Sequence, residues 1–157
     1  PEEQEVMAQA VLSNPLVVLA RNDHPLAHEK NIALARLADE PFLIREPGSG
    51  TRMVALKLFE QHGLTPKIRM ELSTNEAIRE AILAGLGVSI LSRYTLGLEP
   101  EQTQLACLDV EGFPLESHWH FVYPVGKHLS VAARAFMDFA RVEAKGLVLD
   151  GLAQRPR

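Results

Sequence analysis

The sequence predicts an α/β protein. Short apolar segments alternate along the chain with longer amphipathic ones, a pattern typical of strands joined by helical crossovers of about 10 to 14 residues. Hydrophobic residues make up 46% of the 157 residues and charged residues 23%. This composition is unlike that of a disordered chain, and it supplies a core for one ordinary domain or for one and a half small ones.

The first half of the chain contains three predicted strands and two predicted helices. Residues 10–20 hold two apolar stretches on either side of the turn residues 13–15, which predicts short strands in a hairpin-like arrangement. The apolar spacing over residues 51–62 predicts a helix that ends at Gly63. Between these elements stand a polar loop at 21–30, a short helix within 32–39 and a compact strand at 41–45.

The second half continues the alternation. The run "STNEAIREAILAGLG" opens with hydroxyl and amide side chains and continues with apolar residues at helical spacing, which predicts a helix after residues 73–75. Gly85 and Gly87 follow it, and we expect them to allow close packing and a left-handed backbone. The remaining predicted elements are strands at 67–72, 87–92, 104–110 and 118–124, a helix at 131–143 capped by Ser130, and a tail at 144–157.

Charge and cysteine content exclude several classes of function. The net charge is −4, the pI is near 5.9 and the basic residues are scattered, so this chain is not expected to bind nucleic acid by itself. A single cysteine, Cys107, fits a reducing compartment and is expected to be a small buried apolar residue. We find no apolar run of about 18 residues and no signal segment. The start at Pro1 predicts a piece of a longer protein.

The stretch "REPGSGTR" at residues 45–52 joins a predicted strand to a predicted helix. A glycine-rich turn there leaves backbone N–H groups at the helix N-terminus, where the helix dipole favours anions. Ser49 and Thr51 could donate hydrogen bonds, and Arg45 and Arg52 could supply positive charge. The lysine and glycine spacing of a nucleotide P-loop are missing. The alternative is that Ser49 is simply an N-cap in a turn.

A second strand-to-helix junction carries the polar triplet Ser73, Thr74 and Asn75. Ser73 and Glu76 have the spacing of a capping box, which is the purely structural alternative. Ligands of open α/β sheets lie outside the carboxyl ends of the strands. We therefore expect the two polar helix N-termini to converge on one edge of the sheet and to hold a carboxylate, sulfate or phosphate.

The residues of an enzyme or a metal site are poorly represented. His118 and His120 share one side of a predicted strand, but neither a carboxylate nor a cysteine near them completes a metal site, so ordinary strand residues are expected. His24, His28 and His62 are predicted to be solvated. Ser49 is not in a nucleophile-elbow sequence. The chain is therefore predicted to be no enzyme and to hold no metal and no cofactor.

Four segments of the chain, in this order and spacing, carry a family resemblance: "PLVVLARNDHPLA", "LADEPFLIREPGSGTR", "GLTPKIRMELSTNEAIREAILAGLGVSILSR" and "SVAARAFMDF". Together they resemble the effector-binding domain of LysR-type transcriptional regulators, over residues 15 to about 140. Within that family they are most similar to regulators of the carbon-dioxide-fixation (RuBisCO) operon.

The resemblance implies a periplasmic-binding-protein-like fold of two α/β subdomains with an inducer in the cleft between them. Residues 1–21 and 121–143 would form part of the first subdomain, and residues 22–120 the second. The family's winged helix-turn-helix, its linker helix and the opening half of the first subdomain have no counterpart in this chain. Members of the family bind DNA through those parts as homodimers or tetramers. The resemblance also implies a cytoplasmic protein that does not associate with a membrane.

The resemblance also implies a ligand and a function. The expected effector is a small anion, either a phosphorylated metabolite or a reduced dinucleotide, that modulates transcription, with carbon-fixation genes as the expected targets. Two alternatives are a periplasmic-type solute-binding module of a transporter and, less favoured, an enzyme. The residues that match the family's cleft are Ile44, Arg45, Ser49, Thr51, Arg52, Ser73, Thr74 and Asn75.

Overall fold

The computed structural model describes residues 5–96 and 104–153, and the chain forms two compact units. Unit 1 comprises Pro1–Asn14 and Glu116–Arg157, and unit 2 comprises Pro15–Leu115. The sequence placed the corresponding boundaries at residues 21/22 and 120/121. The difference arises in part because residues 16–21 form a strand in the sheet of unit 2. The assignment of the units to regulatory subdomains stays a prediction.

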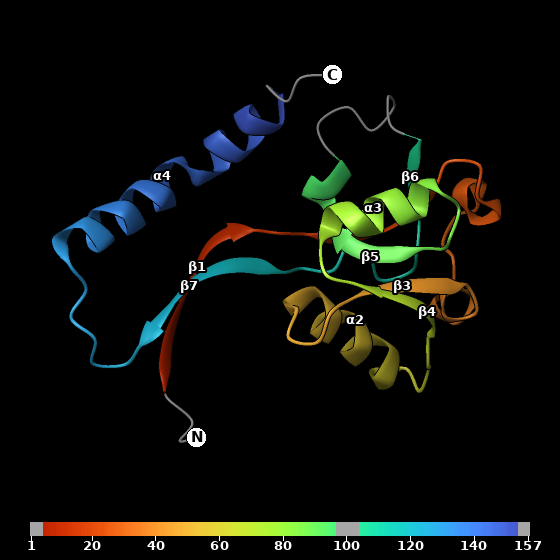
Figure 1. Ribbon diagram of the computed structural model, residues 1–157, viewed down its shortest axis with the longest axis horizontal. Helices are drawn as coiled ribbons and strands as arrows, with labels where there is room; N and C mark the ends of the chain where they lie inside the picture. Colours follow the sequence, from red (N-terminus) through yellow and green to blue (C-terminus); the bar gives the residue numbers. More distant parts are fainter. Residues whose placement is uncertain (1–4, 97–103, 154–157) are drawn as a thin grey trace. The chain divides into compact units, whose positions relative to one another are not determined.

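The sheet of unit 2 combines antiparallel and parallel pairs (Figure 1). Strand β2 (Leu16–Arg21) lies between β5 (Ser89–Ser92) and β6 (Leu105–Leu108), antiparallel to both. Strand β3 (Pro41–Arg45) pairs in parallel with β4 (Lys67–Leu72). A parallel bridge between Phe42 and Val88 joins β3 to the start of β5. The strands therefore follow one another in the order β4-β3-β5-β2-β6.

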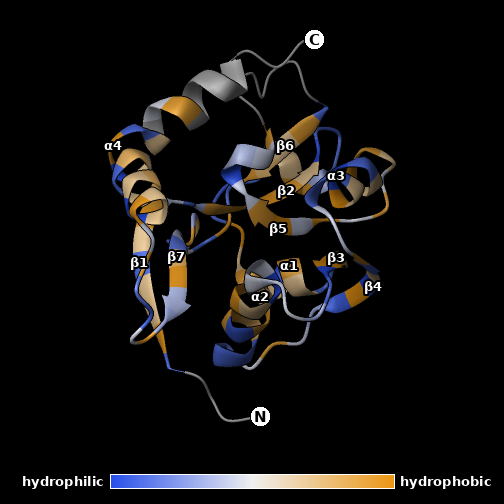
Figure 2. Ribbon diagram, turned by 60° about the vertical axis from the view of Figure 1, so that its left-hand side comes forward, coloured by the Kyte–Doolittle hydropathy of each residue, from blue (hydrophilic) through white to orange (hydrophobic). Residues whose placement is uncertain are grey.

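Helices cover both faces of this sheet. The helices α1 (Leu34–Ala38) and α2 (Gly50–Gln61) pack with one hydrophobic cluster, and α3 (Asn75–Leu83) with another. Val18 belongs to the first cluster and its neighbour Leu19 to the second, because successive side chains of a strand point to opposite faces. Both residues are buried, and Figure 2 shows the apolar character of the central strands.

Unit 1 is built from one strand pair and one long helix. Strand β1 (Val6–Ser13) pairs antiparallel with β7 (His118–Pro124), and α4 (Val131–Ala153) follows. The rings of Phe121 and Phe136 meet edge to face with centroids 5.8 Å apart, and Arg141 donates to the side chain of Gln9. These contacts join α4 to the strand pair.

The α/β class is confirmed, and four details of the sequence analysis are wrong, in addition to the capping box of Ser73 and Glu76 that is described with the site. The strands of residues 6–13 and 16–21 do not form a hairpin, because β1 pairs with β7 and β2 with β5 and β6. Helix α4 continues to Ala153 instead of fading after Ala144. Cys107 is exposed, whereas Leu105 and Leu108 of the same strand β6 are buried. The fourth correction, at His24, is described with the site.

Gly87 supports the expected close packing. A Cβ atom at this position would lie 2.2 Å from the carbonyl oxygen of Pro41, and its φ of +155° is a conformation that L residues rarely adopt. The peptide around Gly87 can therefore approach the start of β3, where Val88 N–H donates to Pro41 O over 2.9 Å.

Candidate functional site

The two polar junctions lie together at one edge of the unit 2 sheet. Strands β3 and β4 run parallel, so the helices that follow them, α2 and α3, begin at the same edge. Arg45 at the end of β3 donates from Nη1 to Oδ1 of Asn75, the first residue of α3, over 2.5 Å. The predicted convergence is confirmed, whereas its use for binding a ligand stays a prediction.

Ser49 caps the N-terminus of α2. Its Oγ accepts a hydrogen bond from the N–H of Arg52 over 3.4 Å, and its backbone is extended. Gly48 precedes it with a φ of +93°, which glycine adopts readily. Thr51 is half-buried in the first turn. The cap confirms the structural reading of Ser49 and leaves the positive end of the helix dipole at the sheet edge.

Thr74 caps α3. Its Oγ1 accepts from the N–H of Ala77 over 3.0 Å, and its backbone is extended. The capping box proposed for Ser73 and Glu76 is wrong, because Ser73 stands one residue before the cap and its side chain is exposed. Ser73 thus remains at the surface next to the helix N-terminus.

Both arginines of the first junction are bound by acidic side chains. Arg45 donates from Nε and Nη2 to the two carboxylate oxygens of Glu46 over 2.7 and 3.0 Å. Arg52 donates from Nη1 to Glu71 Oε2 over 2.6 Å and to the carbonyl oxygen of Arg45 over 2.7 Å. The guanidinium of Arg45 holds the pKa of Glu46 below its ordinary value. The edge is therefore a network of paired charges.

Burial separates the predicted site residues into surface and core. The side chains of Arg45 and Arg52 are 19% and 20% exposed, so they lie mostly within the junction. Ile44 is buried in the first hydrophobic cluster, so its side chain contributes to packing instead of to the junction surface. The structure thus brings together Arg45, Ser49, Thr51, Arg52, Ser73, Thr74 and Asn75, and it places the side chain of Ile44 in the core.

Sequence reasoning did not identify the acidic members of this network. Glu46 forms a visible charged pair with Arg45 in the sequence, but its binding to Arg45 at the site was not predicted. Glu71 lies 19 residues from its partner Arg52, and their contact depends on the pairing of β3 with β4. A local sequence pattern therefore could not have found Glu71.

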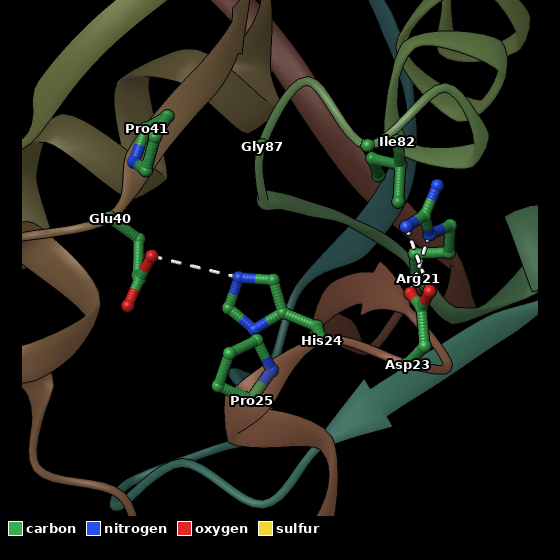
Figure 3. A pocket seen from close by; sticks show the side chains of 9 residues that line it. Arg21, Asp23, His24, Pro25, Glu40, Pro41, Ile82 and Gly87 are labelled. Carbon is green, nitrogen blue, oxygen red and sulfur yellow. Dashed lines mark hydrogen bonds and ion pairs between the residues drawn. The ribbon is translucent and has the colours of Figure 1, made fainter.

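A pocket lies near the amino end of β3, away from the two junctions. Its volume is about 210 Å³, and Figure 3 shows His24, Glu40, Arg21 and Ile82 around it. His24 Nε2 lies 3.6 Å from Glu40 Oε2, and His24 Nδ1 accepts from the N–H of Leu26 over 3.2 Å. The side chain is only 18% exposed, so its predicted solvation is wrong.

The structure describes residues 5–96 and 104–153, and the histidines of β7 lie within this part of the chain. His118 and His120 lie with their ring centroids 6.3 Å apart. In these ranges no group of three or more His, Cys, Asp or Glu side chains could hold a metal ion. Within the same ranges, no helix is both long and apolar enough to span a bilayer.

The comparisons with a family model and with curated proteins all indicate transcriptional regulators. The family model described as LysR substrate binding domain matches residues 1–145. A RuBisCO operon transcriptional regulator of Acidithiobacillus ferrooxidans is 52% identical over 139 residues, which cover 88% of this chain and 45% of that protein. The HTH-type transcriptional activator CmpR of Synechocystis is 48% identical over 139 residues, covering 88% of this chain and 46% of that protein.

A solved structure extends the likeness to three dimensions. The regulatory domain of Synechocystis CcmR in complex with 2-PG is 44% identical, with a TM-score of 0.84, and the alignment covers 94% of this chain and 71% of that one. The chain spans about half the length of the curated relatives it matches. These relatives are transcriptional regulators, so they do not support the transporter alternative.

Proposed function

The chain belongs to the LysR substrate binding domain family, and we propose that it senses a small phosphorylated anion and thereby regulates transcription. One relative named above is a RuBisCO operon transcriptional regulator, and another is the transcriptional activator CmpR. We accordingly propose carbon-fixation genes as the targets of the protein to which this chain belongs.

The observation that carries the proposal is the convergence of two helix N-termini and two arginines at one edge of unit 2. The Arg45–Asn75 hydrogen bond joins the start of α3 to the end of β3, and Arg52 lies in the first turn of α2. Helix N-termini present N–H groups and positive dipole ends, and guanidinium groups bind phosphate in bidentate geometry. This edge therefore suits an anion with several oxygens.

The ligand class is suggested by the relative. The CcmR regulatory domain was solved with 2-phosphoglycolate, a small molecule with a phosphate and a carboxylate. We propose that the same class binds here, with its phosphate near Arg45, Ser49 and Arg52 and its polar remainder near Ser73, Thr74 and Asn75. A reduced dinucleotide is the second candidate ligand, and no contact in the structure specifically favours it.

The regulatory step follows from linkage. A ligand shifts an equilibrium between two arrangements only by the difference of its affinities for them. We propose that anion binding at the junctions favours one arrangement of the regulator, which changes how an oligomer holds DNA. DNA binding would reside in parts of the relatives that this chain does not span. The oligomeric and cytoplasmic states also remain predictions from the family.

The proposal is tested by isothermal titration calorimetry of the chain with 2-phosphoglycolate, glycolate, inorganic phosphate and a reduced dinucleotide. We expect 2-phosphoglycolate to bind more tightly than glycolate, because only the former carries the phosphate. Arg45→Gln should weaken binding by about tenfold or more. Arg36→Gln is the matched control, since Arg36 pairs with Glu29 elsewhere in unit 2. Equal affinity for glycolate, or equal effects of the two substitutions, would contradict the proposal.

A further inference from the structure

The arginines of the proposed anion site already have anionic partners within the protein. All three side-chain nitrogens of Arg45 donate: Nε and Nη2 to Glu46, and Nη1 to Asn75. Arg52 is bound by Glu71 and by the carbonyl oxygen of Arg45. Two positive side chains are thus matched by two negative ones at the place where a phosphate is proposed to bind.

The geometry of these pairs resembles the geometry that a bound phosphate would adopt. Two parallel N–H···O bonds from one guanidinium are the preferred arrangement for a carboxylate and for a phosphate alike. Glu46 offers two carboxylate oxygens to Arg45 at 2.7 and 3.0 Å. A phosphate that approached Arg45 on this side would compete for the same two donors.

The carboxylates can give way more readily than the arginines. The side chains of Glu46 and Glu71 are 36% and 46% exposed, about twice the values for their partners Arg45 and Arg52. Water already solvates much of each carboxylate, so a glutamate that leaves its arginine regains hydration at little cost as long as another anion takes its place on the arginine. Displacement into solvent is therefore inexpensive for the glutamates, whereas the arginines are held by further contacts to Asn75 and to Arg45 O.

We propose that Glu46 and Glu71 are internal counter-anions that occupy Arg45 and Arg52 until the effector's phosphate replaces them. This inference rests on the proposed function and adds a regulatory element to the same site. It has two consequences. The glutamates lower the affinity for anions, so weakly charged metabolites are rejected. Their displacement also changes the contacts of both junctions, since Glu71 lies on β4 and Glu46 directly follows β3.

Another acidic side chain nearby is placed differently. Glu76 lies in the first turn of α3 and is exposed. The helix dipole stabilises the negative charge of Glu76 at this position. Within the part of the chain that the structure describes, Glu76 makes no hydrogen bond or ion pair with Arg45 or Arg52. The inference therefore assigns the counter-anion role to Glu46 and Glu71 alone.

The test is calorimetric titration of the chain and of its Glu46→Gln and Glu71→Gln variants with 2-phosphoglycolate and inorganic phosphate. Glutamine has nearly the shape of glutamate but no charge, so it competes weakly for a guanidinium. We expect each variant to bind 2-phosphoglycolate about three- to tenfold more tightly than wild type, because one repelling charge and one competitor are removed. Glu60→Gln is the matched control on the same helix α2, and it should leave the affinity unchanged.

The outcomes separate the inference from the proposed function. Wild-type binding with unchanged or weaker binding in both variants would overturn the inference alone and would indicate that the glutamates position the arginines. Tighter phosphate binding in the variants, without any preference of wild type for 2-phosphoglycolate over glycolate, would support the counter-anions and contradict the proposed ligand. Failure of every form to bind either anion would overturn both. Thermal melts of each variant verify that it is folded.

Discussion

The two units differ in how fully they bury their apolar side chains. In unit 2, β2 is buried along almost its whole length, with one cluster on each side of it. In unit 1, the helix α4 buries Met137 and Ala140, but Val131 and Val142 are 78% and 77% exposed. Burial thus depends on whether a second layer covers an element and not on its hydropathy alone.

This difference also affects how firmly each unit holds its strand ends. Unit 2 has helices on both faces of its sheet, so the positions of its strand ends are fixed by packing on two sides. The proposed anion site consists entirely of unit 2 residues, between Arg45 and Asn75. Substitutions in the core of unit 2 should therefore lower the free energy of unfolding strongly, and substitutions at matched positions of unit 1 should lower it little.

The largest effect is expected at Gly87. In the Gly87→Val variant the added Cβ atom would lie 2.2 Å from the carbonyl oxygen of Pro41. The backbone would also retain a φ that is unfavourable for valine. We expect a loss of about 4 kcal/mol or more in the free energy of unfolding, measured by urea denaturation.

Gly63→Ala is the control for this substitution. Gly63 also has a positive φ, of +66°, but a Cβ there meets nothing within 4 Å. The expected cost is about 1 kcal/mol, from backbone strain alone. Equal losses of unfolding free energy at the two glycines would show that the close approach to Pro41 does not make residue 87 intolerant of a side chain.

The next largest effect compares one phenylalanine from each unit. Phe59 is fully buried and its ring meets that of Phe42 at 5.5 Å, whereas Phe136 is 61% exposed. Phe59→Ala should cost about 3 to 4 kcal/mol by cavity formation, and Phe136→Ala less than about 1 kcal/mol. The same denaturation experiment measures both, and a larger cost at Phe136 would reverse the comparison of the units.

A smaller effect distinguishes two neighbouring hydroxyls. Thr74→Ala removes the N-cap of α3 and should cost about 1 kcal/mol. Ser73→Ala removes an exposed hydroxyl before the cap and should leave stability within about 0.5 kcal/mol of wild type. A larger cost at Ser73 in thermal melts would restore the capping box that the sequence suggested.

The smallest effect is a change in acid stability. The pKa of Glu46 is lowered in the folded chain, chiefly by its hydrogen bond to Arg45. Its contribution to stability is therefore present above the ordinary glutamate pKa of about 4.5 and is lost as pH falls through the lower folded pKa. Denaturation between pH 3 and 6 should show a shallower acid slope in Glu46→Gln and in Arg45→Gln. An unchanged slope in both would remove this pair from the network.

The sequence predicted where the strands and helices of unit 2 lie better than it predicted which strands pair. The strands at 41–45 and 67–72 agree with β3 and β4, because the first is a short apolar run and the second alternates charged with apolar residues, both of which are strand patterns. Pairing depends on distant segments, so the hairpin of residues 10–20 was wrong. Burial was misjudged in the same way at His24 and Cys107, since a local sequence does not show that Glu40 lies beside His24 or that Cys107 stays exposed between the buried residues Leu105 and Leu108.

The candidate site shows the same division. Residues that follow a strand and begin a helix were found from local pattern, and the convergence of the two junctions followed from parallel strands. The choice between Ser73 and Thr74 as the cap required the backbone itself, because both precede the helix with suitable side chains. Glu71 required the β3–β4 pairing, which no spacing in the sequence records.

The central claim is that unit 2 alone positions an anion at its two helix N-termini. Titration of the ¹⁵N-labelled chain with 2-phosphoglycolate, followed by amide chemical shifts, tests it most directly. We expect the largest shifts at the amides of residues 49–53 and 74–77, with a common saturation curve, and small shifts around the His24 pocket. Shifts confined to that pocket or to β1, β7 and α4 would contradict it.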